Sequence, residues 1–132
     1  SYEKQDGYLA KVMPPIRTSN DVESVWNAIH DGQINTMGTD HVANQLKLKL
    51  GGKDVWDALA GFPGIGTLLP IMLSEGVNKN RITLEKLIQI TSANAAKIFG
   101  MYPHKGSLEK NSDLRLSKLN VANEDNMSIL PT

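Results

Sequence analysis

The fold is indicated most clearly by residues 33–41, which read Gln-Ile-Asn-Thr-Met-Gly-Thr-Asp-His. Residues 33–37 are typical of a short buried strand that stops at Gly38, and Asp40 and His41 follow its end. In a parallel α/β barrel the C-terminal ends of the strands carry the chemistry, and an acid there can bind a metal or move a proton. Aspartate at a strand end is also common as a turn residue or helix cap, so both interpretations stay open on this stretch alone.

The composition bounds the class of protein. The chain has 132 residues, 14 basic and 14 acidic side chains, and no cysteine. This length is sufficient for one domain with a core, and cysteine-bound zinc and disulfides are excluded. Neither a basic excess, an apolar run of membrane-spanning length nor a signal peptide is present. We therefore expect a cytoplasmic protein that binds neither nucleic acid nor membranes.

Two strands separated by one helix are predicted at the start of the chain. Residues 8–13 could form the first strand, which Pro14 and Pro15 end because proline supplies no amide hydrogen. Residues 33–37 form the second strand. A strand, a helix and a strand joined by short connections predict a parallel pair with a right-handed crossover.

The helix between these strands has clear signals at both ends. Asn20 can cap it with Glu23 as the reciprocal partner, and Asp31 and Gly32 end it. Its apolar side chains recur at helical spacing on one face, which comprises Val22, Val25, Trp26 and Ile29.

The middle of the chain is less regular. Residues 42–50 alternate leucine and lysine, which is typical of a strand and equally of a loop whose lysine stems cover apolar surface. Residues 61–66 form a glycine-rich loop that lacks the pattern of a phosphate loop or a dinucleotide fingerprint. Such a loop could bring backbone close to a small ligand or form a plain tight turn.

Three helices are predicted in the following part of the chain. The first spans residues 67–75 and ends at Gly76. Thr83 can cap the second helix and Ser92 the third, and Gly100 closes the third helix. The core stripe of the second helix comprises Leu84, Leu87 and Ile88.

Several short motifs keep a characteristic order and spacing over residues 11–113. They are Met13-Pro14-Pro15-Ile16-Arg17, Gly38-Thr39-Asp40-His41, Gly61-Phe62-Pro63-Gly64, the run from Thr91 to Gly100, and the run from Tyr102 to Leu108. Together they resemble the cyclic amidohydrolases, above all the dihydropyrimidinases and D-hydantoinases, with allantoinases and dihydroorotases as more distant relatives.

The resemblance implies an α/β fold, the C-terminal part of an amidohydrolase-type (β/α)8 barrel with the start of a return to a small β-sandwich. Residues 1–104 would belong to the barrel of this metal-dependent hydrolase, and residues 105–132 would be the returning segment and a polar tail. Within the barrel part, residues 8–13 would be the seventh strand, residues 33–37 the eighth, and residues 67–100 the closing helices. A whole barrel needs about 250 residues, so we expect only a part of one.

The resemblance also implies chemistry. Such enzymes hydrolyse the ring amide of dihydropyrimidines or hydantoins to N-carbamoyl amino acids, with two divalent metal ions, usually zinc, bridged by a carboxylated lysine and a hydroxide. Asp40 matches the aspartate that ligates one metal and shuttles the proton. The substrate-binding backbone matches Ala60, Gly61, Phe62, Pro63 and Gly64, although several hydantoinases have an asparagine near Ala60.

Other features of the family are missing from the sequence. Its His-x-His pair, carboxylated lysine and two further histidines lie on earlier strands, and the three histidines here form no such pair. We therefore expect the isolated chain to be inactive and to bind no metal, whereas the complete enzyme would be a homotetramer. The alternatives are a non-catalytic dihydropyrimidinase-like scaffold, an allantoinase- or dihydroorotase-type hydrolase, and a self-associating fragment.

Overall fold

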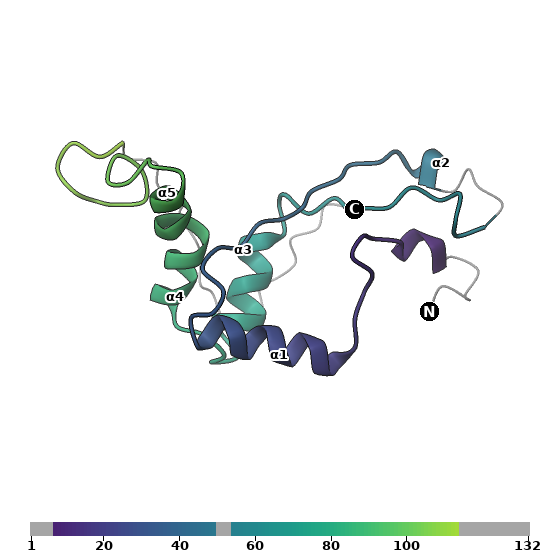
Figure 1. Ribbon diagram of the computed structural model, residues 1–132, viewed down its shortest axis with the longest axis horizontal. Helices are drawn as coiled ribbons and strands as arrows, with labels where there is room; N and C mark the ends of the chain where they lie inside the picture. Colours follow the sequence, from purple (N-terminus) through teal and green to yellow (C-terminus); the bar gives the residue numbers. More distant parts are fainter. Residues whose placement is uncertain (1–6, 50–53, 114–132) are drawn as a thin grey trace.

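The computed structural model describes residues 7–49 and 54–113, which form a small helical body with long extensions (Figure 1). No helix in these residues is long and apolar enough to cross a membrane. The chain exposes 10523 Å², whereas a compact protein of 14.4 kDa would expose about 6,800 Å². The elements are η1 (Gly7–Ala10, a 3-10 helix), α1 (Ser19–His30), α2 (Leu46–Lys49), α3 (Leu68–Ile71), η2 (Met72–Val77, a π-helix), α4 (Leu84–Ile88), η3 (Gln89–Ala93, a π-helix) and α5 (Asn94–Ile98).

Helix α1 begins with a capping box. The Thr18 hydroxyl accepts a hydrogen bond from the amide of Asp21, and the Asp21 carboxylate accepts from the Thr18 amide at 3.0 Å and from its hydroxyl at 2.7 Å. These hydrogen bonds lower the pKa of the Asp21 carboxyl. The predicted cap at Asn20 is therefore wrong by two residues: Thr18 has the extended backbone of an N-cap, and Asn20 already lies inside the helix. The predicted end is confirmed: Asp31 is the C-cap and Gly32 follows with φ 78°.

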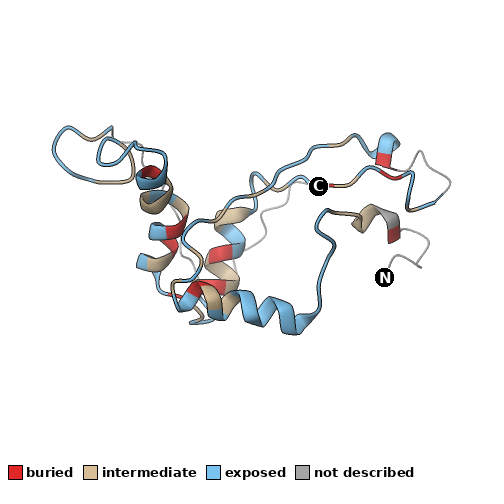
Figure 2. Ribbon diagram, in the orientation of Figure 1, coloured by how far each residue is buried: buried red, intermediate tan, exposed pale blue. Residues whose placement is uncertain are grey.

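The core lies where the end of α1 meets the helices of residues 68–98 (Figure 2). Among the predicted core residues of α1, Ile29 is 1% exposed, whereas Val22 and Val25 are each 49% exposed. Only the last turns of α1 reach the other helices, so its first turns keep their apolar face open. The buried members of this core are Ile29, Met72, Ile82, Leu87 and Ile90.

Residues 68–77 and 84–98 form two helical segments, each of which contains a π-helical turn. The first segment continues through Gly76 to Val77, one residue beyond the predicted end. The predicted cap at Thr83 is confirmed, since its side chain accepts from the Lys86 amide at 3.1 Å. Ser92 caps nothing, because the helix passes through η3 into α5 without a break. Gly100 ends the segment as predicted, with φ 67°.

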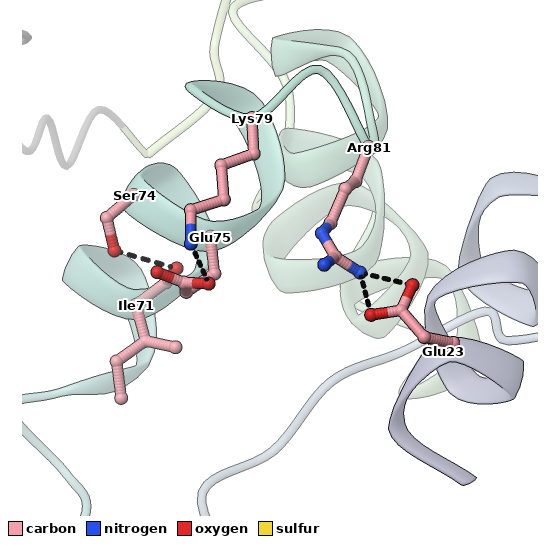
Figure 3. A network of polar contacts seen from close by, with 6 residues as sticks. All are labelled: Glu23, Ile71, Ser74, Glu75, Lys79 and Arg81. Carbon is pink, nitrogen blue, oxygen red and sulfur yellow. Dashed lines mark hydrogen bonds and ion pairs between the residues drawn. The ribbon is translucent and has the colours of Figure 1, made fainter. Parts of the chain in front are cut away.

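An ion pair joins α1 to the turn between the two helical segments (Figure 3). Nη1 of Arg81 lies 2.8 and 2.7 Å from the two carboxylate oxygens of Glu23. The guanidinium also lies 5.5 Å from the ring centre of Trp26, which packs against the core. Arg81 thus contacts both a charged and an aromatic side chain of α1.

The predicted strands are not formed within the described residues. Residues 7–10 are a 3-10 helix, and residues 33–37 have no regular secondary structure. Residues 33–37 instead contact the helices: the Met37 amide donates to Ile90 O at 3.0 Å, and Asn94 Nδ2 donates to Asn35 O at 2.9 Å. A parallel strand exists only as part of a ladder, and no described segment supplies that ladder to either stretch.

The predicted return to a β-sandwich lies partly beyond the described residues. Residues 105–113 form turns without a strand, and an ion pair of 2.6 Å joins Lys105 to Asp113. Residues 114–116 of the predicted return and most of the predicted polar tail lie outside the described part of the chain.

Replacement of Thr18 by alanine tests the capping box. Loss of its hydroxyl leaves the Asp21 amide without its partner, so we expect the free energy of unfolding to fall by about 1 kcal/mol. Urea unfolding followed by circular dichroism measures this change. Ser19→Ala is the control, since the Ser19 side chain has no hydrogen bond to any described residue; equal effects of the two substitutions would contradict the assignment.

A pair of leucines in α4 tests the position of the core. Leu87 is 1% exposed and Leu84 is 41% exposed. We expect Leu87→Ala to lower the free energy of unfolding by about 2–3 kcal/mol through lost burial and a cavity, and Leu84→Ala by less than about 1 kcal/mol. The same urea titration compares the two variants, and a larger loss in Leu84→Ala would place the core on the wrong face of α4.

Candidate functional site

Asp40 lies in the extended segment that follows α1, where residues 33–45 have no regular secondary structure. Its φ is 45°, in the left-handed region that aspartate enters more readily than most residues. The side chain is exposed, and its carboxylate has no hydrogen bond or ion pair to any other described residue. The segment therefore presents the open carboxylate of Asp40, which is free to bind a cation or accept a proton.

The imidazole of His41 connects the segment that carries Asp40 to the glycine-rich loop. Its Nδ1 accepts hydrogen bonds from the amides of Gly64 at 2.9 Å and Ile65 at 3.2 Å. A ring nitrogen that accepts carries no proton, so a neutral imidazole has its hydrogen on Nε2. This is the opposite of a histidine that binds a metal through Nε2 and donates from Nδ1. His41 is thus arranged to hold the loop.

Backbone contacts continue this connection along the chain. The amide of Val42 donates to Phe62 O at 2.9 Å, and Nδ2 of Asn44 donates to Ala60 O at 2.9 Å. The amide of Gly61 donates to Lys11 O at 3.0 Å. The structure therefore brings the predicted substrate-binding residues 60–64 beside the segment that carries Asp40, as the two neighbouring extended segments of Figure 1 illustrate.

One position of the loop, Gly61, requires glycine because the facing segment lies so close and its φ is positive. Gly61 has φ 118°, and a Cβ there would lie 2.5 Å from Cβ of Val42. A Cβ on Gly64 would lie 3.4 Å from Thr39 O, the carbonyl just before Asp40. These contacts show that the loop is packed on the segment that carries Asp40 and is not an isolated tight turn.

Lys49 is a member of this region that the sequence did not single out. Its ammonium donates to Leu9 O and, at 3.5 Å, to Lys11 O, and it lies 4.6 Å from the ring centre of Phe62. The residue is 8% exposed, and burial lowers the pKa of its ammonium. The signal was the lysine and leucine alternation, but nothing local distinguishes Lys49 from the exposed Lys47. The predicted strand is not formed in residues 42–49: residues 42–45 are irregular, as the loop alternative predicted, and residues 46–49 form the one-turn helix α2.

The other candidate residues lie apart from this region. His30 pairs with the adjacent Asp31 at 3.0 Å, His104 is exposed in a turn, and Arg17 contributes to the lowered pKa of Asp21. A hollow of about 330 Å³ near α4 and α5 contains none of the predicted site residues; its lining is Ile88, Ser92, Lys105, Gly106, Ser107, Leu108 and Asp113.

The described residues alone do not form a complete metal site. Across residues 7–49 and 54–113 no three or more histidine, cysteine, aspartate or glutamate side chains gather in a way that could hold an ion. Asp40 can supply one carboxylate ligand, whereas zinc sites use three or four protein ligands. The donor set present therefore does not fit a pair of zinc ions by itself.

Known proteins resemble this chain in both sequence and structure. It is 41% identical over 116 residues to the L-hydantoinase of Paenarthrobacter aurescens, a match that covers 87% of this chain and 25% of that protein. It is 37% identical over 129 residues to the dihydroorotase of Methanosphaera stadtmanae, with 98% and 28% covered. The crystal structure of dihydropyrimidinase from Brevibacillus agri matches with a TM-score of 0.79 and 36% identity, over 85% of this chain and 25% of that chain.

These likenesses confirm the predicted resemblance to dihydropyrimidinases and hydantoinases, and they imply a TIM-barrel-type fold. The chain spans about a quarter of the length of the relatives that it matches, 25% of one and 28% of another. Residues 12–124 match the amidohydrolase family. With nearly the whole sequence inside that match, the chain belongs to the amidohydrolase family.

Proposed function

We propose that this chain is the C-terminal portion of a cyclic amidohydrolase of the dihydropyrimidinase or hydantoinase type. In the proposed reaction, water adds to the carbonyl carbon of a ring amide. The C–N bond then breaks, and the leaving nitrogen receives a proton, which yields an N-carbamoyl amino acid. The observation that carries this proposal is the open carboxylate of Asp40 beside the loop of residues 60–64.

Asp40 is the residue that we assign to proton transfer. Its carboxylate is exposed and unpaired among the described residues, so it can take a proton from the attacking water and deliver it to the leaving nitrogen. Amidohydrolases are generally metal-dependent, and a divalent ion, when bound, would lower the pKa of the attacking water. Two zinc ions in the complete enzyme would take Asp40 as one ligand and all others from outside the described residues.

The loop of residues 60–64 is suited to bind the ring. Within the described structure, the amide of Phe62 and the carbonyls of Gly61 and Pro63 have no hydrogen-bond partner. A cyclic amide carries an N–H donor next to a C=O acceptor, so open backbone groups of both kinds complement it. Three other polar groups of this loop, Ala60 O, Phe62 O and the Gly64 amide, bond to the segment that carries Asp40, which helps to keep the open ones in place.

The complete barrel would also supply the neighbouring strands that the extended segments lack. We infer that residues 8–13 and 33–37 take the positions of the seventh and eighth barrel strands once neighbouring strands provide hydrogen-bond partners. Residues 67–100 would then close the outside, and residue 105 would begin the return to the β-sandwich. Large exposed apolar side chains such as Phe99, at 74%, support burial against further protein.

The names of the relatives favour hydantoins and dihydropyrimidines as substrates. Hydantoinases and a dihydropyrimidinase recur among the matches, and a dihydroorotase is also present. We therefore propose a small cyclic amide as the substrate, with a dihydroorotase-type ring as the alternative. A homotetramer in the cytoplasm completes the proposal for the whole enzyme.

Elemental analysis tests the proposed incompleteness of the metal site. We expect the purified chain of 132 residues to carry no stoichiometric zinc after dialysis against a low zinc concentration, because one carboxylate cannot hold the ion. Hydantoin and dihydrouracil should remain intact in its presence. About two zinc ions per chain, or hydrolysis by the chain alone, would contradict the proposal.

Reconstitution tests the proposed role of Asp40. We expect hydrolysis of hydantoin or dihydrouracil when the chain is combined with the remaining three quarters of the Paenarthrobacter L-hydantoinase. Asp40→Asn should lower the rate by at least about a hundredfold, because the amide cannot accept the proton. Asp31→Asn is the control, since among the described residues that carboxylate pairs only with the exposed His30. Undiminished turnover by Asp40→Asn would contradict this role.

A further inference from the structure

His41 occupies the junction between the proposed catalytic carboxylate and the proposed ring-binding loop. It directly follows Asp40, and its Nδ1 receives two consecutive backbone amides, those of Gly64 and Ile65. Consecutive amides that converge on one point form a concave donor pair of the kind that binds anions. In this loop a neutral imidazole nitrogen fills that position, so the two amides are occupied from within the chain.

His41 contacts the loop at Gly64 and Ile65, directly after residues 61–63, which carry the open backbone groups. The Val42 amide holds Phe62 O at 2.9 Å, and the His41 imidazole holds Gly64 and Ile65. Between these attachments lies the open carbonyl of Pro63, and the open amide of Phe62 lies just before the first of them. Because the neighbouring residues His41 and Val42 make both attachments, the loop cannot shift along their segment without breaking these hydrogen bonds.

We propose that His41 is a positioning residue, which sets the separation between the Asp40 carboxylate and the open backbone groups of residues 61–63 through the two amides that Nδ1 accepts. The catalytic consequence rests on the proposed function, whereas the attachment of the loop does not. His41 binds neither the metal nor the substrate in this scheme, since its Nδ1 lone pair is committed to the loop and Nε2 carries the hydrogen.

Two substitutions separate the hydrogen bonds from the bulk of the side chain. His41→Asn retains an acceptor, Oδ1, at the same number of bonds from the backbone as Nδ1. His41→Leu retains apolar bulk and removes the acceptor. If the hydrogen bonds matter, the asparagine variant should resemble the wild-type chain and the leucine variant should not.

Amide hydrogen exchange of the chain, measured by NMR, tests the attachment without any need for activity. We expect the exchange of the Gly64 and Ile65 amides to accelerate by about tenfold in His41→Leu and to stay near the wild-type rate in His41→Asn. Gly66 is the internal control, because its neighbourhood is open and His41 does not bind it. The 15N spectrum of the wild-type imidazole should show the hydrogen on Nε2. Unchanged exchange in His41→Leu would overturn the proposal.

The reconstituted enzyme tests the catalytic consequence. We expect KM for the cyclic amide to rise by about tenfold in His41→Leu, with a smaller change in kcat, and to recover in His41→Asn. Equal KM values in the two variants would overturn this consequence, because bulk alone would then explain the effect. If even the wild-type assembly fails to hydrolyse any cyclic amide, the proposed function fails, while the exchange measurement still decides the attachment.

Discussion

Burial of Ile29 against Met72, Leu87 and Ile90 is the interaction on which the helical body depends. It places the end of α1 against both later helical segments, and the Arg81–Glu23 ion pair lies at the same junction. An exposed ion pair contributes little alone, but the contact of Arg81 with Trp26 joins it to apolar packing. The core is small, so most of the apolar surface on α1 and α5 remains open.

The candidate site is built differently from this body. It lies on extended segments, and polar contacts hold it: Nδ1 of His41 accepts from two amides, the Val42 amide donates to Phe62 O, and the buried Lys49 donates to the carbonyls of residues 9 and 11. Such contacts bring Asp40 and residues 60–64 together over a distance of about twenty residues in sequence. A site of this kind is ordered by specific donor and acceptor positions, so single substitutions such as His41→Leu can loosen it.

Several features were predictable because their causes lie within a few residues. The end of α1 at Asp31 and Gly32, the Thr83 cap and the Gly100 terminus depend on local hydrogen bonds and on φ values that favour glycine. Asn20 was the wrong cap because two overlapping capping boxes exist in the sequence, and only the observed backbone distinguishes them. Asp40 was singled out by its place after a predicted strand and the loop by its glycines, and the resemblance to the amidohydrolases then implied a role for each.

The sequence by itself determined the family and several helix ends, because motifs and caps are short and local, and it proposed Asp40 and residues 60–64 as site residues. Only the tertiary structure decided that residues 33–37 pair with helices in place of a strand, that Lys49 is buried, and that His41 binds the loop. The physical reason is that these outcomes depend on partners distant in the chain. A strand needs a ladder and a buried ammonium needs carbonyls, and neither partner can be deduced from neighbouring residues.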